Sequence, residues 1–499
     1  MVTRIARQVA GQATRQARRA AAGMLGAGGE RMSKVDTAWL RMDSATNLMM
    51  IVGVWTLKPR LHYEDLCVRV QERLLKYNRF RQRIEQDAAG ATWVEHPVDI
   101  HDHVVREALP RRRGVSAQQA LQDRVGELAM MPLDHSRPLW QIHLVEDFEG
   151  GSALIVRIHH CIADGIALIS VTMSLVDGGA PPPERRRKRD AAGAEDWIAD
   201  TLIKPFTDVA VKALGAAGDG AARSLGLLHD PQKAMTGSVE AAKLGYQVLS
   251  DAMSLLLMPD DSPTRLKGKP GARKRVAWCP PLPLDEVKAV GKALNCSVND
   301  VLLSCVAGAI GEYLRSQGDE VEGREIRAMV PVNLRPVDEA WKLGNRFGLV
   351  PLVLPIGIAN PIERVYEVRR RMNALKGSTQ PLLAFLVLAL SGLLIKPAQD
   401  AILHLFGRKT TAVMTNVPGP RERLQLLGST LEQCMFWVPQ SGDIGLGVSI
   451  LSYGGGVQFG VIGDTALCPD PQKIIDEFEP EFAKLSIVTL MLPWGEEQP

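Results

Sequence analysis

A short segment at residues 178–189 cannot take part in a hydrophobic core, and it restricts the fold of this chain more than any other feature. It joins two glycines, three consecutive prolines and a run of arginine and lysine. Proline removes backbone donors and like charges repel one another, so the segment is typical of a linker. Because 499 residues also exceed what one core usually spans, we predict two folded units.

Strand-like and helix-like segments are mixed on both sides of this linker, which indicates an α+β fold with a mixed β-sheet in each unit. We predict a basic arm over residues 1–31, a first domain over 32–180, a linker and helical connector over 181–275, and a second domain over 276–499. The predicted strands are Met50–Leu57, Leu139–Val145 and Ala153–Ile158, then Val276–Trp278, Arg327–Pro331, Leu349–Leu354, Lys409–Thr415, Gly445–Ser452 and Val457–Ile462.

The basic arm has no acidic side chain before Glu30. Its arginines stand among apolar residues, which leaves three alternatives: a disordered tail, a helix on a membrane surface, or a targeting peptide. The whole chain is nearly neutral, with a formal net charge of +3, which argues against a surface built to bind nucleic acid. The arginines of the arm are Arg4, Arg7, Arg15, Arg18 and Arg19.

Residues 381–395 are apolar on every face of a helix. Because a helix that spans a bilayer needs about 20 such residues, we predict no transmembrane span. A buried helix, a wall of an acyl-chain tunnel and an interfacial membrane contact are the alternatives.

The seven cysteines are odd in number and far apart, and no two form a Cys-x-x-Cys pair. This spacing predicts a reducing, cytoplasmic environment, with neither a disulfide framework nor a zinc site. We expect no metal and no cofactor. Cys161 is an alternative nucleophile because of where it lies, although small buried thiols are common in protein cores.

The strongest chemical signal is the sequence His-His-Cys-Ile-Ala-Asp-Gly at residues 159–165. It lies between a predicted strand and the apolar helix Ile166–Val176, so it occupies a strand-to-helix turn. A histidine with an ordinary pKa near ~6.5 can remove the proton of an alcohol. From the residues alone, the pair is open to three interpretations: core histidines, metal ligands without a third ligand nearby, or a catalytic site.

The pattern His-His-x-x-x-Asp-Gly resembles the active-site motif of the coenzyme A-dependent acyltransferase superfamily. That resemblance implies two chloramphenicol-acetyltransferase-like domains. It also implies that His160 is the general base and that His159 and Asp164 are chiefly structural. Gly165 closes the turn and joins the expected substrate-binding residues.

Further segments, taken in their order and spacing, are similar to the bacterial wax ester synthase/diacylglycerol acyltransferase family from about residue 32 to the C-terminus. Met50 departs from the family, where a histidine is often found, as does the basic arm. The matching segments are Ser33–Asp36, Phe80–Arg83, Pro138–Trp140, Arg273–Trp278, Ser297–Asp300 and Asn416–Pro420.

This resemblance implies transfer of a long-chain acyl group from acyl-coenzyme A, as co-substrate, to diacylglycerol or a fatty alcohol. It also implies a peripheral location at the inner face of a membrane or at a lipid droplet. The oligomeric state is left open. A condensation-type acyltransferase acting on another alcohol or amine, and a lipid-binding protein without turnover, are the alternatives.

Three more residues belong to the expected site. Asn299, in the Asn-Asp pair that opens a helix, is either an N-cap or a group that positions the oxyanion. Arg335 is either a surface residue or a partner of Asp164 across the domains, as in related acyltransferases. Asn416 begins a rigid loop that fits a cleft rim, where it would contact substrate.

Basic residues precede the first strand of the second domain. Coenzyme A carries phosphates, so Arg273, Lys274 and Arg275 are candidates for binding it. A solvated linker explains these charges equally well.

Overall fold

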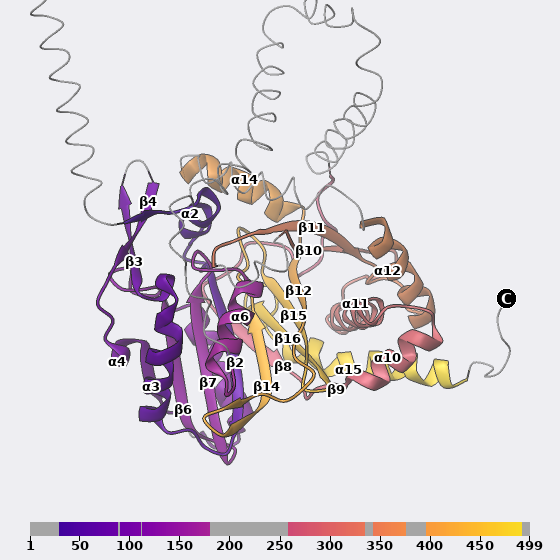
Figure 1. Ribbon diagram of the computed structural model, residues 1–499. Helices are drawn as coiled ribbons and strands as arrows, with labels where there is room; N and C mark the ends of the chain where they lie inside the picture. The colour runs from indigo at the N-terminus through magenta and orange to yellow at the C-terminus, as the bar shows by residue number, and fades with distance from the viewer. Residues whose placement is uncertain are drawn as a thin grey trace, which may run out of the picture.

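The computed structural model describes residues 29–87, 90–110, 112–179, 258–334, 343–375 and 396–491. Two large sheets with helices packed on them form the molecule (Figure 1), which confirms the predicted α+β fold. Arg335, the apolar segment 381–395 and most of the arm and connector lie outside the described residues. The boundaries at residues 31, 180 and 275 stay predictions.

The first sheet has six strands, and all neighbours pair antiparallel except β5 and β6. Two of the predicted strands form the hairpin β6–β7, whose turn contains Glu149 and Gly150 with φ of 50° and 78°, as two-residue hairpin turns require. In order across the sheet, the strands are β13 (Gln425–Leu426), β14 (Ser429–Trp437), β2 (Met50–Lys58), β7 (Gly151–His159), β6 (Trp140–Phe148) and β5 (Val104–Glu107).

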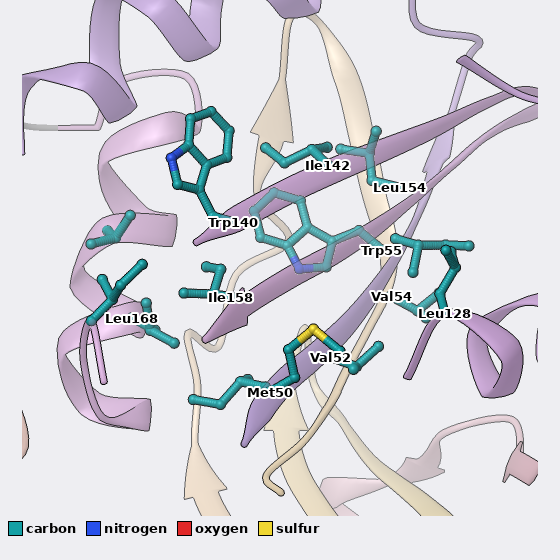
Figure 2. Close-up of a cluster of buried hydrophobic side chains, with 14 of the residues drawn as sticks. Met50, Val52, Val54, Trp55, Leu128, Trp140, Ile142, Leu154, Ile158 and Leu168 are labelled. Carbon is teal, nitrogen blue, oxygen red and sulfur yellow. The ribbon is translucent and has the colours of Figure 1, made fainter. Parts of the chain in front are cut away.

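Helices cover both faces of this sheet and bury its apolar side chains. Figure 2 shows part of the core, where Trp140 and Ile158 lie toward the helix that carries Leu168. A small apolar cavity of about 40 Å³ remains on this side. The helices of the first half are α2 (Lys34–Arg41), α3 (Tyr63–Arg73), α4 (Ile100–His103), α5 (Ala117–Ala129) and α6 (Gly165–Leu175), with short 3-10 turns η1 (Leu74–Lys76) and η2 (Asn78–Phe80).

The second sheet has seven strands, with parallel pairs on both sides of β12. A separate three-stranded sheet in the first half is formed by β1 (Glu30–Arg31), β4 (Gly90–Glu95) and β3 (Gln82–Asp87). The strands of the second sheet are β11 (Phe347–Leu354), β10 (Ile326–Asn333), β12 (Ala412–Pro418), β15 (Leu446–Tyr453), β16 (Gly456–Asp464) and β8 (Lys274–Trp278), with β9 (Leu282–Pro283) paired to β16.

All but one of the described helices of the second half pack around α11 (Val298–Ser316), which is buried along most of its length. Its first turn is held by a capping box, because Ser297 and Asp300 each accept a backbone N–H of the other. The set comprises α10 (Leu284–Ala293), α11 (Val298–Ser316), α12 (Pro361–Leu375), α14 (Lys396–Arg408) and α15 (Gln472–Leu490).

One strand pairing differs from the expectation that each half forms its own sheet. Strand β14, from the second half, pairs with β2 along nearly its whole length, for example Phe436 with Gly53. The first sheet is therefore completed by a strand that lies far away in sequence (Figure 1). This strand physically joins the two halves beside β2 and β7.

No single described helix is long and apolar enough to cross a membrane. Helices α10 and α11 together have the length and apolar composition of a span, but the chain bends by 99° between them. Because α11 is packed inside the second half, burial in the protein core explains its apolar composition.

Candidate active site

The motif follows β7 directly and ends in the first turn of α6. The backbone N–H of His160 donates to the Met49 carbonyl at 2.7 Å, which extends the β2–β7 pairing by one residue. Asp164 is the N-cap of α6, and its Oδ1 accepts the N–H of Ala167 at 3.0 Å. The motif is thus held on one side by a strand ladder and on the other by a helix cap.

Both ring nitrogens of His159 have hydrogen-bond partners. Its Nδ1 accepts the N–H of Cys161 at 3.2 Å, so the ring proton of a neutral His159 lies on Nε2, 3.2 Å from Oδ2 of Asp43. Oδ1 of Asp43 accepts the N–H of Met49 at 2.6 Å. This arrangement supports the structural role expected for His159.

His160 lies in an aromatic environment with only 3% of its surface exposed. Its ring stacks on Trp39 of α2, with centroids 4.2 Å apart, and lies 5.5 Å from Phe347 of β11. Burial lowers the pKa of His160 to about 4, although Asp164 partly opposes the shift. The ring is therefore neutral at pH 7, which is the state that a general base requires.

Space adjoins the motif at Gly165. A Cβ added at this position would meet no atom within 4 Å, so the missing side chain leaves room at the start of α6. His160 does not line the apolar cavity beside Trp140. It also does not line either of two further pockets, one between α5 and β8 and one beside Met50.

The lowered pKa of His160 predicts an unusual pH dependence of kcat/KM. Removing a proton from the ring activates it, so a lower pKa moves the acid limb to lower pH. An ordinary histidine base would lose about tenfold by pH 5.5, whereas we expect a change of less than about twofold between pH 7.5 and 5.5. Initial rates at saturating acceptor, with the protein's fold checked at each pH, would show this. An acid limb near pH 6.5 would contradict it.

A segment of the second half contacts the motif loop, and the sequence reasoning missed it. Gly344 forms a parallel bridge with Ala163, with its N–H donating to the Ile162 carbonyl at 3.2 Å. Its φ of +108° is a conformation that favours glycine. Oδ2 of Asp164 accepts the N–H of Arg346 at 2.9 Å. Across the halves, Asp164 thus contacts the backbone of Arg346, and its own N–H donates to the Gly344 carbonyl at 3.3 Å, while the predicted partner Arg335 lies outside the described residues.

Asp36 connects the opening segment Ser33–Asp36 to the same loop. Its Oδ1 accepts the N–H and the Nδ2 of Asn345, at 3.1 and 2.7 Å. Burial raises the pKa of Asp36 to about 6, so the carboxyl is largely ionised at pH 7. The contact of Asp36 with Asn345 gives a structural reason for the similarity of the segment Ser33–Asp36 to the family. A Gly-Asn pair just before a strand was the available signal for residues 344 and 345.

Asn299 and Asn416 lie together. Nδ2 of Asn416 donates to Oδ1 of Asn299 at 3.0 Å, so the helix start of α11 is joined to the end of β12. Ser297 is the N-cap of α11, so the interpretation of Asn299 as the cap was wrong. No hydrogen bond or ring contact within the described ranges connects either asparagine to His160, and their catalytic roles stay predictions.

The three basic candidates do not share one environment. Arg273 and Arg275 are exposed, but Lys274 points inward, where its Nζ lies 3.3 Å from Asp464 and donates to Asn47 at 2.8 Å. The side chains of Lys274 and Asp464 are only 2% and 0% exposed. This buried ion pair fits a structural role and weighs against contact of the Lys274 side chain with coenzyme A, because alternation along β8 turns Lys274 away from Arg275.

A groove with a volume of about 730 Å³ runs between α5 and β8, and we call it the α5–β8 groove. The helix lies so close to the strand that a Cβ on Gly126 would be 2.5 Å from the Lys274 carbonyl. A much smaller pocket, with a cavity volume of about 10 Å³, shares Met130 and Lys274 with the groove and is also lined by Met50, which pairs with His159. The charged residues lining the groove are Arg112, Asp123, Arg124, Glu127, Arg273, Lys274 and Arg275.

The structure weighs against Cys161 as a nucleophile. Its side chain is fully buried, and burial raises the pKa of the thiol well above its usual value, which keeps it protonated. Within the described ranges, no group of three His, Cys, Asp or Glu side chains could hold a metal ion.

Similarity to known proteins extends along nearly the whole chain. A probable diacylglycerol O-acyltransferase of Mycobacterium tuberculosis is 25% identical over 477 residues, which is 92% of this chain and 96% of that protein. Wax ester synthase/diacylglycerol acyltransferase 8 of Arabidopsis thaliana is 23% identical over 472 residues, covering 86% of this chain and 91% of that protein.

Solved structures show the same fold. The wax ester synthase/diacylglycerol acyltransferase from Marinobacter aquaeolei VT8 superposes with a TM-score of 0.63 at 21% identity, covering 92% of this chain and 99% of that one. The first condensation domain of the calcium-dependent antibiotic synthetase gives 0.57 at 14% identity, covering 92% of this chain and 96% of that one. Likeness at this level of identity shows the fold alone.

The family comparison is more specific. Residues 32–302 match the wax ester synthase/diacylglycerol acyltransferase catalytic domain, and residues 343–486 match the C-terminal domain of the same family. The first match includes the His-His-x-x-x-Asp-Gly motif and the Asn-Asp pair, and the second includes the segment Gly344–Arg346 that contacts the motif. The chain belongs to the wax ester synthase/diacylglycerol acyltransferase family.

Proposed function

We propose that this protein is an O-acyltransferase that moves a long-chain fatty acyl group from acyl-coenzyme A to the hydroxyl of diacylglycerol or of a fatty alcohol. The observation that carries the proposal is His160, a buried histidine whose pKa of about 4 keeps it neutral, in the motif of an acyltransferase family. The relatives named as diacylglycerol acyltransferases and wax ester synthases support the choice of acceptors.

In the proposed reaction, His160 removes the proton of the acceptor hydroxyl as its oxygen attacks the thioester carbonyl carbon. The carbon–sulfur bond then breaks, and the proton passes from the imidazolium to the leaving thiolate. Oδ1 of Asn299 is occupied by Asn416, which leaves the Nδ2 of Asn299 as a donor for the oxyanion or the substrate. No acyl-enzyme forms, since Cys161 is buried and protonated.

The α5–β8 groove is the proposed site for the phosphates of coenzyme A. Arg124 is neutralised by Glu107 and Glu127, at 3.1 and 2.9 Å. Within the part of the chain that the structure describes, the side chain of Arg275 donates only to a neutral carbonyl, that of Pro469, at 3.0 Å. Among the described residues, Arg273 makes no ion pair, so these two exposed charges are available for anions.

Replacing both Arg273 and Arg275 by alanine tests this site. We expect KM for palmitoyl-coenzyme A to rise about tenfold, with kcat changed less than twofold, because two exposed charge-assisted contacts of about 0.5–1 kcal/mol each would be lost. The matched control is Arg315→Ala, which removes an exposed arginine of α11 that pairs with Glu312. An unchanged KM in the double variant would place the phosphates elsewhere.

One assay tests the function as a whole. Purified protein is incubated with palmitoyl-coenzyme A and either diolein in phosphatidylcholine vesicles or hexadecanol, and free thiol and neutral lipid are both followed. We expect thiol release that matches triacylglycerol or wax ester formation. Thiol release that is the same with and without acceptors would refute transfer to a lipid alcohol.

The acceptors themselves suggest where the protein works. Diacylglycerol and fatty alcohols partition into membranes and lipid droplets, so we propose a peripheral location at the cytoplasmic face of a membrane or on a droplet. In the vesicle assay, protein that floats with the diolein vesicles would support this location, and protein that stays entirely in the aqueous fraction would oppose it.

A further inference from the structure

The ring of His160 lies flat against the face of an indole. The centroids of His160 and Trp39 are 4.2 Å apart, and the two ring planes differ by only 19°, so the rings are stacked. Phe347 of β11 completes the cluster, with its centroid 5.5 Å from His160 and 5.8 Å from Trp39. The predicted base therefore contacts aromatic rings from both halves of the chain.

The helix that carries Trp39 is fixed on both sides of this residue in the sequence. Three residues before it, Asp36 accepts two hydrogen bonds from Asn345, at 2.7 and 3.1 Å. Directly before it, the Ala38 carbonyl accepts a hydrogen bond from the side chain of Gln399 in α14 at 3.0 Å. Both partners belong to the second half. The indole is thus held in place by contacts that do not depend on a substrate.

Both stacked rings are shielded from water. Trp39 is 5% exposed and His160 is 3% exposed. A charge in such a place is not screened by solvent, so its interactions are stronger than in water. The face of an indole attracts a cation that lies within about 6 Å of its centroid, and the attraction is larger when both partners are desolvated. A neutral imidazole has no net charge and gains far less from the same contact.

A nearby carboxylate, that of Asp164, has other contacts to satisfy. One of its oxygens accepts the N–H of Ala167, and the other accepts the N–H of Arg346. Its negative charge also acts on His160. The indole of Trp39 differs from this carboxylate because it presents its whole face to the ring of His160.

We propose that Trp39 stabilises the imidazolium that His160 becomes when it takes the proton of the acceptor hydroxyl. The proposal rests on the proposed acyl transfer and adds a group that acts on its base. Because the attraction is strong only for the charged ring, it stabilises the transition state, in which the proton is partly transferred, more than the resting enzyme. When the imidazolium gives its proton to the leaving thiolate, the charge disappears and so does the attraction.

Fluorinated tryptophans test the proposal without removing a side chain. Fluorine atoms on the benzene ring withdraw electron density from the indole face and nearly conserve its shape, and they are introduced at residue 39 of the full chain only. We expect kcat with palmitoyl-coenzyme A and diolein to fall stepwise as fluorines are added, by about tenfold when the benzene ring is fully fluorinated. A desolvated contact of this kind is worth a factor of about 30 for a full charge, and the transition state carries part of that charge. KM for palmitoyl-coenzyme A should change less than twofold, because the ring is neutral in the resting enzyme.

NMR of the protein with ¹³C-labelled histidine shows whether the rings stay stacked. The indole face shifts the ring protons of His160 upfield, and His160→Gln assigns their signals. We expect this upfield shift in the wild type and in every fluorinated protein. An unchanged kcat across the series, with the stacking retained, would overturn the proposal. Wild-type signals of His160 without the upfield shift would overturn it as well.

The matched control introduces the same fluorinated residues at Trp278. This tryptophan of β8 is also buried, and its ring packs against Trp437, with the centroids 5.7 Å apart. It should leave kcat within about twofold of the wild type. An equal loss of kcat at both positions would show a general effect of fluorination and would contradict a specific role of Trp39.

The protonation of His160 separates this inference from the proposed function, because it is recorded without substrate. A weaker attraction for the charged ring lowers the pKa of His160, while Asp164 and His159, whose charges also act on this pKa, are the same in all the proteins. The labelled proteins are titrated from neutral pH downward over the range in which they stay folded. If the wild type turns over neither acceptor while fluorination still lowers this pKa, the role of Trp39 holds and the function fails. If turnover is normal and neither kcat nor the pKa depends on fluorination, the function holds and the role of Trp39 fails.

Discussion

His160→Ala should lower kcat of acyl transfer by at least about 100-fold, which is the lower end of what a positioned general base contributes. Without the imidazole, nothing else at the motif can take the alcohol proton in the same way. The ring of His159 is held by Asp43 and Cys161, and Asp164 is engaged by two backbone N–H groups. A hydroxyl with its proton in place is a poor nucleophile at neutral pH.

Two further variants make this result specific. His160→Gln keeps more of the volume between Trp39 and Phe347 and should show the same loss, which would exclude a collapse of the aromatic packing as its cause. His62→Ala removes an exposed histidine just before α3 and should leave kcat within about twofold of the wild type. Rates are compared by thiol release, with thermal midpoints of all three variants recorded alongside. Near-normal turnover in His160→Ala would rule out the proposed mechanism.

Local pattern was enough to predict the parts of the site that lie close together in sequence. The apolar run before His159 becomes β7, and the apolar helix after Asp164 becomes α6, because strand and helix periodicity are properties of short segments. The turn between β6 and β7 follows for the same reason, since Glu149 and Gly150 suit a tight hairpin.

Contacts between distant segments could not be predicted in the same way. Nothing within Ser429–Trp437 indicates that it pairs with β2 and not with a strand of its own half. The three residues that contact the motif loop, Gly344 to Arg346, act through backbone groups and one amide. The Gly-Asn pair before β11 indicates a turn, but it does not indicate which distant segment that turn contacts. The inward direction of Lys274 depends on where β8 begins, and the predicted strand began two residues later, at Val276.

Asp164→Ala should cause the largest loss of stability among the motif variants and should also lower activity. The carboxylate is 3% exposed and accepts the N–H of Ala167 at 3.0 Å and that of Arg346 at 2.9 Å. Loss of the N-cap is worth about 1 kcal/mol, and leaving the Arg346 N–H without this acceptor costs about 1–3 kcal/mol more. We therefore expect a loss of about 2–4 kcal/mol and a thermal midpoint lower by several degrees.

Activity should fall together with stability because the same carboxylate holds the loop that carries His160 against the segment Gly344–Arg346. We expect kcat to fall at least about tenfold at a temperature where the variant is still folded. Asp164→Asn is the matched comparison: its side-chain oxygen can still cap α6, so it should retain about half of the lost stability, while an NH₂ group facing the Arg346 N–H cannot replace the second bond. A thermal midpoint of Asp164→Ala equal to that of the wild type would show that this aspartate does not connect the two halves.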